Sequence, residues 1–275
     1  MKKLGVLLCY NDADFLKICI DHLIDSGHDI VVWDHGSTDD TSKVLDSFGN
    51  LFVERKFVPR SFDFYKLYPS MSQNLIDNYI KSYDWISWPD QDEILEGPNR
   101  SKTYSDYLDD VYEGGYDYIC FNNINFWHTE DDDIAICDPV RRIKHYSIFP
   151  DCSPRIRSWR ACKTNLRRFN HNAVGRYKYP INFNLRHYPM RSNEQMMERL
   201  LVTRANLSSG ATNIHYENMK SNIDRLLIPG SYLHYDDGSD LNLAIKYDWR
   251  TVYGYGKPQS RLQQAGNRLK KILKR

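Results

Sequence analysis

The sequence lacks the signatures of several protein classes. Its six cysteines include no C-x-x-C pair, there is no internal repeat or low-complexity linker, and no stretch approaches the roughly 20 apolar residues that span a bilayer. A zinc site or a disulfide framework is therefore not indicated. Cys9 and Cys19 fall instead in apolar-patterned segments, which favours buried thiols in a reducing compartment.

An excess of charge of one sign is also missing. Lysine and arginine total 37 against 36 aspartates and glutamates, a formal net charge of +1, so the chain carries no global signature of a nucleic-acid binder. The apolar run at residues 4–10 meets Asn11 and Asp12 too early for the core of a signal peptide. We therefore expect a cytoplasmic protein.

What the sequence does contain is an alternation of apolar strands and amphipathic helices. Residues 4–10 and 30–33 are apolar runs of the kind found in strands buried on both faces. Between them, apolar residues recur at helical spacing from Phe15 to Leu23, and Gly27 can end that helix. The pattern then predicts, in chain order, a helix from about residue 38, a strand at 51–57, a helix at 70–82 and a strand at 85–88. This alternation predicts an α/β fold with a mostly parallel central sheet flanked by helices and with ligand sites at the carboxyl ends of its strands.

After residue 115 the pattern of apolar and polar residues changes. Aromatic and polar strands are expected at 116–126, 155–162 and 177–187, which indicates a mixed sheet, and the capping-box pattern of Ser192 with Gln195 predicts a helix start. We therefore predict one domain over residues 1–255, made of halves 1–115 and 116–255. A helical extension at 256–275 is expected to follow it.

The sharpest chemical motif is Asp90-Gln91-Asp92-Glu93, which directly follows the apolar strand at 85–88. Carboxylates at i and i+2 just past a strand can point the same way onto a hard cation, and Mg²⁺ or Mn²⁺ combines one or two protein carboxylates with phosphate oxygens. A solvated acidic turn is the structural alternative. The position at a buried strand's end favours a metal–diphosphate site that contains Asp90 and Asp92.

A second acidic motif follows the strand at 30–33 and reads Asp34-His35-Gly36-Ser37-Thr38-Asp39-Asp40-Thr41. Its Gly-Ser-Thr also serves as a turn and a helix cap. Strand–D-x-G-S-T-D-x-T, about fifty residues before a strand–D-x-D, resembles the family 2 glycosyltransferases and their close relatives over about residues 4–100. Many of those proteins carry a second Asp at the position of His35.

The resemblance implies a GT-A fold in which residues 1–115 bind a nucleotide sugar and 116–255 form the acceptor half. It implies that the first strand's end (Tyr10, Asn11) and Asp34 with Ser37 border the donor nucleotide, with the Asp34 carboxylate accepting a hydrogen bond from the base or the ribose. An uncharged base packed near Tyr10 would suit that geometry, and a UDP-sugar is the favoured donor. Asn74 is implied to lie near the nucleotide, and a helix-surface role is its alternative.

A third segment, LRHYPMRS at 185–192, resembles a stretch in one branch of family 2-like proteins. The resemblance implies that His187 completes the metal sphere, and a neutral imidazole suits Mn²⁺ better than Mg²⁺. A structural histidine is the alternative. Arg191 precedes the predicted helix start, where a cation beside helix N–H groups can bind the donor diphosphate.

No motif identifies the catalytic base. Inverting transfer needs a carboxylate that takes the proton of the acceptor hydroxyl, and many family 2 members supply it from an E-D pair roughly ninety residues past the D-x-D. This chain has no E-D pair there. Glu93, next to Asp92, is the first candidate, and a strand-end cap is its structural alternative. Asp138 and Glu194 are further candidates.

Two basic segments remain. The basic residues between 155 and 168 could receive an anionic acceptor or form a solvated strand face. The segment 256–275 includes a basic amphipathic pattern suited to an anionic membrane surface, where each basic residue contributes about 1 kcal/mol. Packing of this helix on its own domain is the alternative.

We therefore expect a Mn²⁺- or Mg²⁺-dependent hexosyltransferase. It would move a sugar from a nucleoside-diphosphate sugar to a glycan or lipid-linked acceptor, with inversion, in the synthesis of cell-surface polysaccharide or lipopolysaccharide at the inner face of the cytoplasmic membrane. A sugar nucleotidyltransferase is excluded, because an acidic segment follows the first strand where that class has a Gly-rich, Arg-containing loop. A non-catalytic sugar- or partner-binding protein on a degenerate transferase scaffold is the alternative. Inversion is the favoured outcome, and retention is its alternative. Donor sugar, acceptor, linkage, catalytic base and oligomeric state stay open.

Overall fold

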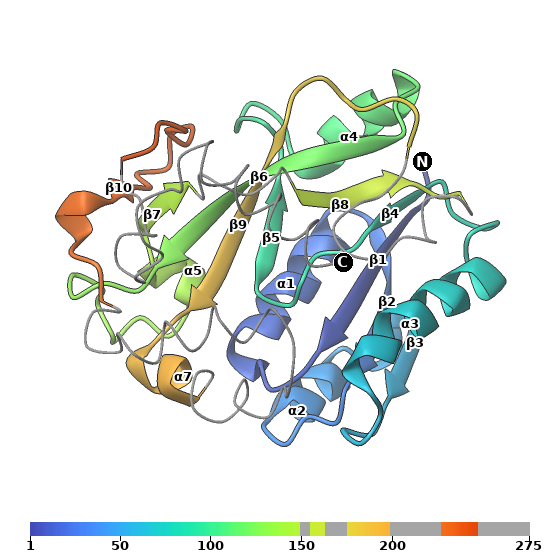
Figure 1. The fold of residues 1–275 in the computed structure, drawn as a ribbon, viewed down its shortest axis with the longest axis horizontal. Coiled ribbons are helices and arrows are strands. Elements are labelled where there is room, and N and C mark those ends of the chain that lie inside the picture. Colours follow the sequence, from blue (N-terminus) through green and yellow to red (C-terminus); the bar gives the residue numbers. More distant parts are fainter. Residues whose placement is uncertain (149–154, 163–174, 199–226, 247–275) are drawn as a thin grey trace, which may run out of the picture.

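The computed structural model describes residues 1–148, 155–162, 175–198 and 227–246, and its strands form one ten-stranded sheet (Figure 1). The strands are β1 (Lys3–Cys9), β2 (His28–Asp34), β3 (Phe52–Phe57), β4 (Trp85–Ser87), β5 (Glu93–Glu96), β6 (Tyr118–Trp127), β7 (His145–Ile148), β8 (Arg155–Arg160), β9 (Phe183–Met190) and β10 (His234–Tyr235). The helices are α1 (Ala13–Asp25), α2 (Thr41–Ser47), α3 (Phe64–Asn78), α4 (Tyr104–Glu113), α5 (Pro139–Arg142) and α7 (Asn193–Glu198), with short 3-10 turns at Gly49–Leu51 and Gly230–Tyr232. The predicted α/β class is confirmed.

The first half of the chain forms the parallel part of the sheet. β1 pairs in parallel with β2 on one side and with β4 on the other, and β2 pairs in parallel with β3. The carboxyl ends of these strands therefore meet at one edge. Because β1 and β2 end at Cys9 and Asp34 and β4 ends at Ser87, this edge carries both acidic motifs.

Helices cover both faces of this parallel part. Leu7 and the buried apolar residues of α1 belong to one apolar cluster, whereas Val6 and the buried apolar residues of α3 belong to another. Neighbouring residues of a strand point to opposite faces, so α1 and α3 lie on opposite sides of the sheet. Burial of each large apolar side chain contributes about 1.5–3 kcal/mol, which holds the acidic edge on a rigid support.

The second half of the chain is mixed, as the sequence predicts. β8 is antiparallel to both β4 and β6, β6 is parallel to β9, and β9 is antiparallel to β5. Since β5 follows β4 after only a short turn, the Asp90–Asp92 segment lies between the parallel half and the β9 strand that carries His187.

Two predicted helix starts are wrong. α2 begins at Thr41 instead of about residue 38, because 35–38 form the turn after β2. α3 begins at Phe64 instead of about Ser70: Asp63 caps it by accepting a hydrogen bond from the backbone N of Tyr65 (2.9 Å), and Pro69 lies inside the helix. Proline usually ends a helix, so the sequence alone favours a start after it.

Several predictions concern residues outside the described part of the chain. The extension at 256–275 lies there, as do Lys163, Arg167 and Arg168 of the basic cluster. Cys9 and Cys19 are buried free thiols, as predicted. Cys120 is also a buried free thiol, whereas Cys137 is an exposed one. In the described ranges, no helix has the length and apolar character needed to cross a bilayer.

A buried histidine makes stability depend on pH. His28 lies in the core with Nε2 at 2.9 Å from the Ser87 hydroxyl, and burial, helped by the nearby Lys3 ammonium, lowers the pKa of His28 to about 3. The unfolded chain takes up this proton below about pH 6.5 and the folded chain does not, so the free energy of unfolding should fall by about 1.4 kcal/mol per pH unit between pH 6 and 4. Burial also lowers the pKa of His22, which adds to the same trend.

Urea unfolding measured at several pH values checks this expectation. His28→Gln should reduce the dependence of the unfolding free energy on pH by about 1.4 kcal/mol per pH unit, the contribution of one proton. An equal slope in the variant and the wild type would contradict the assignment.

Candidate functional site

The turn after β2 joins two strand ends. Oδ1 of Asp34 accepts hydrogen bonds from the backbone N (3.0 Å) and hydroxyl (2.6 Å) of Ser37, and the Ser37 hydroxyl accepts one from the backbone N of Asn11 (3.0 Å). Asn11 follows β1 with a φ of 46°, an uncommon value outside glycine. The structure thus brings Asn11, Asp34 and Ser37 together, as the sequence predicts.

Gly36 is required by this turn. Its φ is +68°, and a Cβ built there would lie 2.7 Å from the backbone N of Arg60. Gly49 has a similar φ of +54° with no atom within 4 Å of a Cβ, which makes it a matched control. We expect Gly36→Ala to cost about 1–3 kcal/mol more than Gly49→Ala in urea unfolding, since only the first adds a backbone clash to the strained φ. Equal losses would contradict the proposed close packing against Arg60.

His35 and Tyr10 are linked through Arg60. The Arg60 guanidinium lies 4.0 Å from the centre of the Tyr10 ring and its NH1 is 2.9 Å from Nδ1 of His35, whose Nε2 is 3.0 Å from the Phe62 carbonyl. Burial, and next the Arg60 charge, lower the pKa of His35 despite the Phe62 contact. The ring is therefore neutral at pH 7, with Nε2–H donating to Phe62 and Nδ1 accepting from Arg60. Where many family 2 members have an acid, this chain has a neutral ring that holds an arginine.

The acidic triplet after β4 is tied to the end of β1. The Gln91 side chain accepts from the backbone N of Tyr10 (2.6 Å) and donates to the Tyr10 carbonyl (3.0 Å). The Asp92 carbonyl accepts from the backbone N of Tyr188 on β9 (2.9 Å). Gln91, which the D-x-D pattern leaves unspecified, therefore fixes the triplet beside the Asn11–Asp34 turn.

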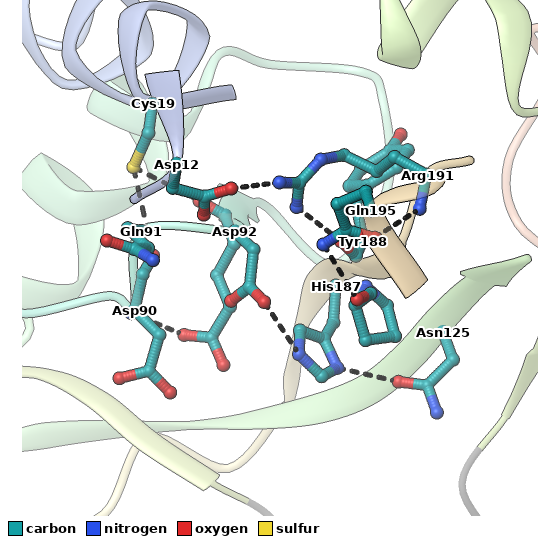
Figure 2. Close-up of polar contacts among 12 residues, drawn as sticks. Asp12, Cys19, Asp90, Gln91, Asp92, Asn125, His187, Tyr188, Arg191 and Gln195 are labelled. Atoms are coloured by element: carbon teal, nitrogen blue, oxygen red, sulfur yellow. Dashed lines mark hydrogen bonds and ion pairs between the residues drawn. The ribbon is translucent and has the colours of Figure 1, made fainter. Parts of the chain in front are cut away.

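Asp92 and His187 face each other at the centre of this edge (Figure 2). Oδ2 of Asp92 lies 3.6 Å from Nε2 of His187, beyond normal hydrogen-bond range, and both side chains are largely buried. On the other side of the ring, Nδ1 of His187 lies 2.8 Å from Oδ1 of Asn125 on β6. An amide oxygen can only accept, so Nδ1 of His187 carries a proton and Nε2 is the ring nitrogen that faces Asp92. Asn125 was not predicted as a site residue.

Asp90 and Glu93 form a charged cluster with two arginines of β8. Arg157 donates to Asp90 and to Oε1 of Glu93 (2.7 Å), and Arg155 donates to the same Glu93 oxygen (2.6 Å). Burial raises the pKa of Asp90, with help from its neighbouring carboxylates and against the Arg157 charge. Burial alone would also raise the pKa of Glu93, but Arg157 and Arg155 lower it to about 2.

This cluster changes the interpretation of Glu93 and of the basic strand. The Glu93 side chain is fully buried, and a carboxylate with so low a pKa accepts protons poorly. The geometry favours the structural alternative for Glu93. The solvated alternative for the basic strand is wrong at Arg157, which is 3% exposed. Of the other candidates, Asp138 caps α5 by accepting from Val140 (2.8 Å), and Glu194 lies in the first turn of α7.

Arg191 does not have the surroundings predicted for an anion site. Arg191 is 1% exposed, and its guanidinium donates to Asp12 and to the Tyr188 carbonyl (2.9 Å) (Figure 2). It also donates to both oxygens of Asp14 (2.8 and 2.9 Å). Two carboxylates at the start of α1 thus neutralise it. Arg191 therefore links α1 to the end of β9. The predicted helix after it is confirmed: the backbone N of Gln195 in α7 donates to the Ser192 hydroxyl (3.1 Å).

Asn74 is not brought to the strand-end cluster. It lies near the end of α3, where its Nδ2 donates to Oε2 of Glu54 (2.9 Å) on β3. Glu54 also accepts from Trp33 (2.7 Å) and Tyr79 (2.8 Å). This network joins the helix to the sheet, which matches the helix-surface alternative for Asn74.

Among the residues that the structure describes, no three histidine, cysteine, aspartate or glutamate side chains are grouped to hold a metal. The pair of Asp92 and His187 nevertheless fits a shared cation. Two ligand atoms that each lie about 2.1 Å from one ion can be at most about 4.2 Å apart, and this pair meets that limit. One carboxylate oxygen and one imidazole nitrogen form a donor set suited to Mn²⁺ or Mg²⁺ when phosphate oxygens supply further ligands.

The sequence matches no protein-family model and no curated protein. Among solved structures, the chain is similar to TarS of S. aureus with 12% identity and a TM-score of 0.38 over 81% of this chain and 43% of that chain. It is also similar to TarS 1–349 in complex with UDP (12% identity, TM-score 0.36, 81% of this chain and 71% of that chain).

A third similar structure is glucosyl-3-phosphoglycerate synthase from Mycobacterium tuberculosis in complex with Mn²⁺, UDP and phosphoglyceric acid. It has 17% identity and a TM-score of 0.27 over 47% of this chain and 44% of that chain. The chain thus spans less than half of the length of the first TarS chain and of this synthase. These similarities concern the fold alone.

Proposed function

We propose that the protein is a metal-dependent glycosyltransferase that moves a sugar from a nucleoside-diphosphate sugar, with a UDP-sugar favoured, to a glycan or lipid-linked acceptor. The observation that carries the proposal is the pair of Asp92 and His187, whose Oδ2 and Nε2 lie 3.6 Å apart. Gln91 ties this pair to the end of β1 and hence to the Asp34 turn. A metal-binding pair beside a polar turn at the carboxyl ends of parallel strands suits a ligand with both a diphosphate and a nucleoside.

Asp92 and His187 would hold the cation, Mn²⁺ or Mg²⁺, with Asp90 beside them. When bound, the cation would neutralise the charge of the leaving diphosphate. Other residues of the chain fix the positions of these ligand atoms. Asn125 sets the tautomer of His187, the Tyr188 N–H holds the Asp92 backbone, and Arg157 holds Asp90. Such supporting contacts keep ligands oriented and are costly to remove.

We also propose that the protein works at the inner face of the cytoplasmic membrane, in the synthesis of a surface polysaccharide or lipopolysaccharide. The support is the basic amphipathic pattern near the end of the sequence. Deletion of residues 261–275 should reduce co-sedimentation with anionic liposomes. Unchanged co-sedimentation would contradict this part of the proposal.

One experiment tests the function directly. Calorimetry with UDP, in the presence and absence of Mn²⁺, should show binding that depends on the metal, and a panel of UDP-sugars with Mn²⁺ should include one that the protein hydrolyses or transfers. Binding without turnover of any donor or acceptor would favour the non-catalytic alternative. Absence of metal-dependent nucleotide binding would overturn the assignment.

A further inference from the structure

β6 carries three asparagines whose side chains have different surroundings. Asn122 donates to Asn184 (3.2 Å) and accepts from Asn182 (3.1 Å), and Asn125 accepts from His187. Asn123 is 4% exposed, yet neither its Oδ1 nor its Nδ2 has a hydrogen-bond partner among the residues that the structure describes. One carboxamide of the three is thus buried with its hydrogen-bonding capacity unused.

This arrangement is costly for the folded protein. A buried polar group without a partner costs about 1–3 kcal/mol, and a carboxamide contains both a donor group and an acceptor. Its neighbour across the sheet on β9 is Leu185, a fully buried apolar residue that offers no side-chain partner. An apolar side chain at position 123 would be more stable, so a partner from outside the chain gives a physical reason for the asparagine.

The direction of the side chain points to the candidate site. Residues i and i+2 of a strand lie on the same face about 6.6 Å apart, so Asn123 shares its face with Asn125, and Asn122 lies on the opposite face. Asn125 orients His187, which faces Asp92. Asn123 is therefore one strand repeat away from Asn125, which contacts the proposed metal ligand His187.

We propose that Asn123 binds two adjacent hydroxyls of a sugar ring, and that this ring is the sugar of the nucleotide donor. The inference rests on the function proposed above. A carboxamide presents a donor and an acceptor side by side, and neighbouring sugar hydroxyls can each donate and accept, so one ring satisfies both atoms. The donor sugar is favoured over the acceptor because it is bonded to the diphosphate, which would lie beside Asp92 and His187.

The test is Asn123→Leu, which keeps the size of the side chain and removes its polar atoms. We expect an unchanged or higher Tm, because the unsatisfied group is gone, and unchanged calorimetric affinity for UDP with Mn²⁺. Affinity for the UDP-sugar that the wild type uses should fall by about 10- to 100-fold. Asn122→Leu is the matched control: it should lower the Tm, because Asn182 and Asn184 lose partners, and leave the ratio of UDP-sugar to UDP affinity unchanged.

Donor analogues that lack one ring hydroxyl sharpen the test. At least one deoxy analogue should bind the wild type more weakly than the parent sugar and bind Asn123→Leu as well as the parent does. Unchanged donor affinity with a raised KM for a glycan acceptor would overturn the donor assignment in favour of the acceptor. Unchanged values for both would overturn a sugar-binding role altogether. A wild type that binds no UDP with Mn²⁺ would overturn the proposed function itself, a result that is distinct from the other two.

Discussion

Asp92→Ala should abolish metal-dependent nucleotide binding. The Asp92 carboxylate lies 3.6 Å from Nε2 of His187, its side chain is buried, and its backbone carbonyl accepts a hydrogen bond from the Tyr188 N–H. Its removal leaves a single imidazole, which cannot hold Mn²⁺ against water. Loss of contacts that merely support a metal ligand costs about 10- to 100-fold in affinity, so loss of the ligand itself should cost about 100-fold or more. Calorimetry with UDP and Mn²⁺ measures this loss, and turnover should fall with it.

The matched control is Asp109→Asn, because Asp109 lies on α4 and pairs with Lys3 at 3.5 Å, away from the strand-end cluster. This variant should bind UDP and Mn²⁺ like the wild type. His187→Ala should resemble Asp92→Ala, since the proposal uses both ligand atoms. Wild-type affinity of Asp92→Ala for UDP with Mn²⁺ would contradict the metal assignment. If Asp109→Asn lost as much affinity as Asp92→Ala, the effect would be nonspecific.

The parts of the fold that the sequence predicts are those with a repeating pattern. β1, α1 and β2 are recognisable because buried strands and one-sided helices place apolar residues at fixed spacing. α4 was not predicted, although Thr103 and Asp106 form a capping box and Tyr104, Tyr107, Leu108 and Val111 are buried on one face. The capping box and the one-sided apolar pattern are sufficient to predict this helix from the sequence.

The site was predictable to the extent that its residues lie in short motifs. Asn11, Asp34 and Ser37 gather as expected, and so do Asp92 and His187. Arg157 and Asn125 have no motif of their own, because their roles depend on β8 and β6 meeting strands more than sixty residues away in the sequence. Long-range contacts also give Arg191 surroundings that differ from the predicted anion site, because its partners Asp12 and Asp14 precede it by more than 170 residues.

Glu93→Gln should separate the two roles left open for this residue. The carboxylate is fully buried between Arg155 and Arg157, so its loss leaves two guanidinium groups with less compensation. Breaking a buried ion pair costs about 3–5 kcal/mol, and we expect about 3 kcal/mol here, because Asp90 still neutralises Arg157. For a chain of this size the Tm should fall by about 6–12 °C. At a temperature where the variant is folded, kcat should change by less than about 10-fold.

A catalytic base would give the opposite pattern, with kcat reduced by about 100- to 10,000-fold and the Tm nearly unchanged. Arg157→Met is the second single variant of a double-mutant cycle with Glu93→Gln. If Glu93 and Arg157 act as one structural pair, the double variant should be less destabilised than the sum of the single variants, by 1 kcal/mol or more as is typical of coupled residues. Arg160→Met on the same strand is the control, since Arg160 lies at 3.8 Å from Asp117 and is partly exposed. Additive losses in the cycle would show that Glu93 does not depend on Arg157, and the acceptor's base would again be sought at Glu93.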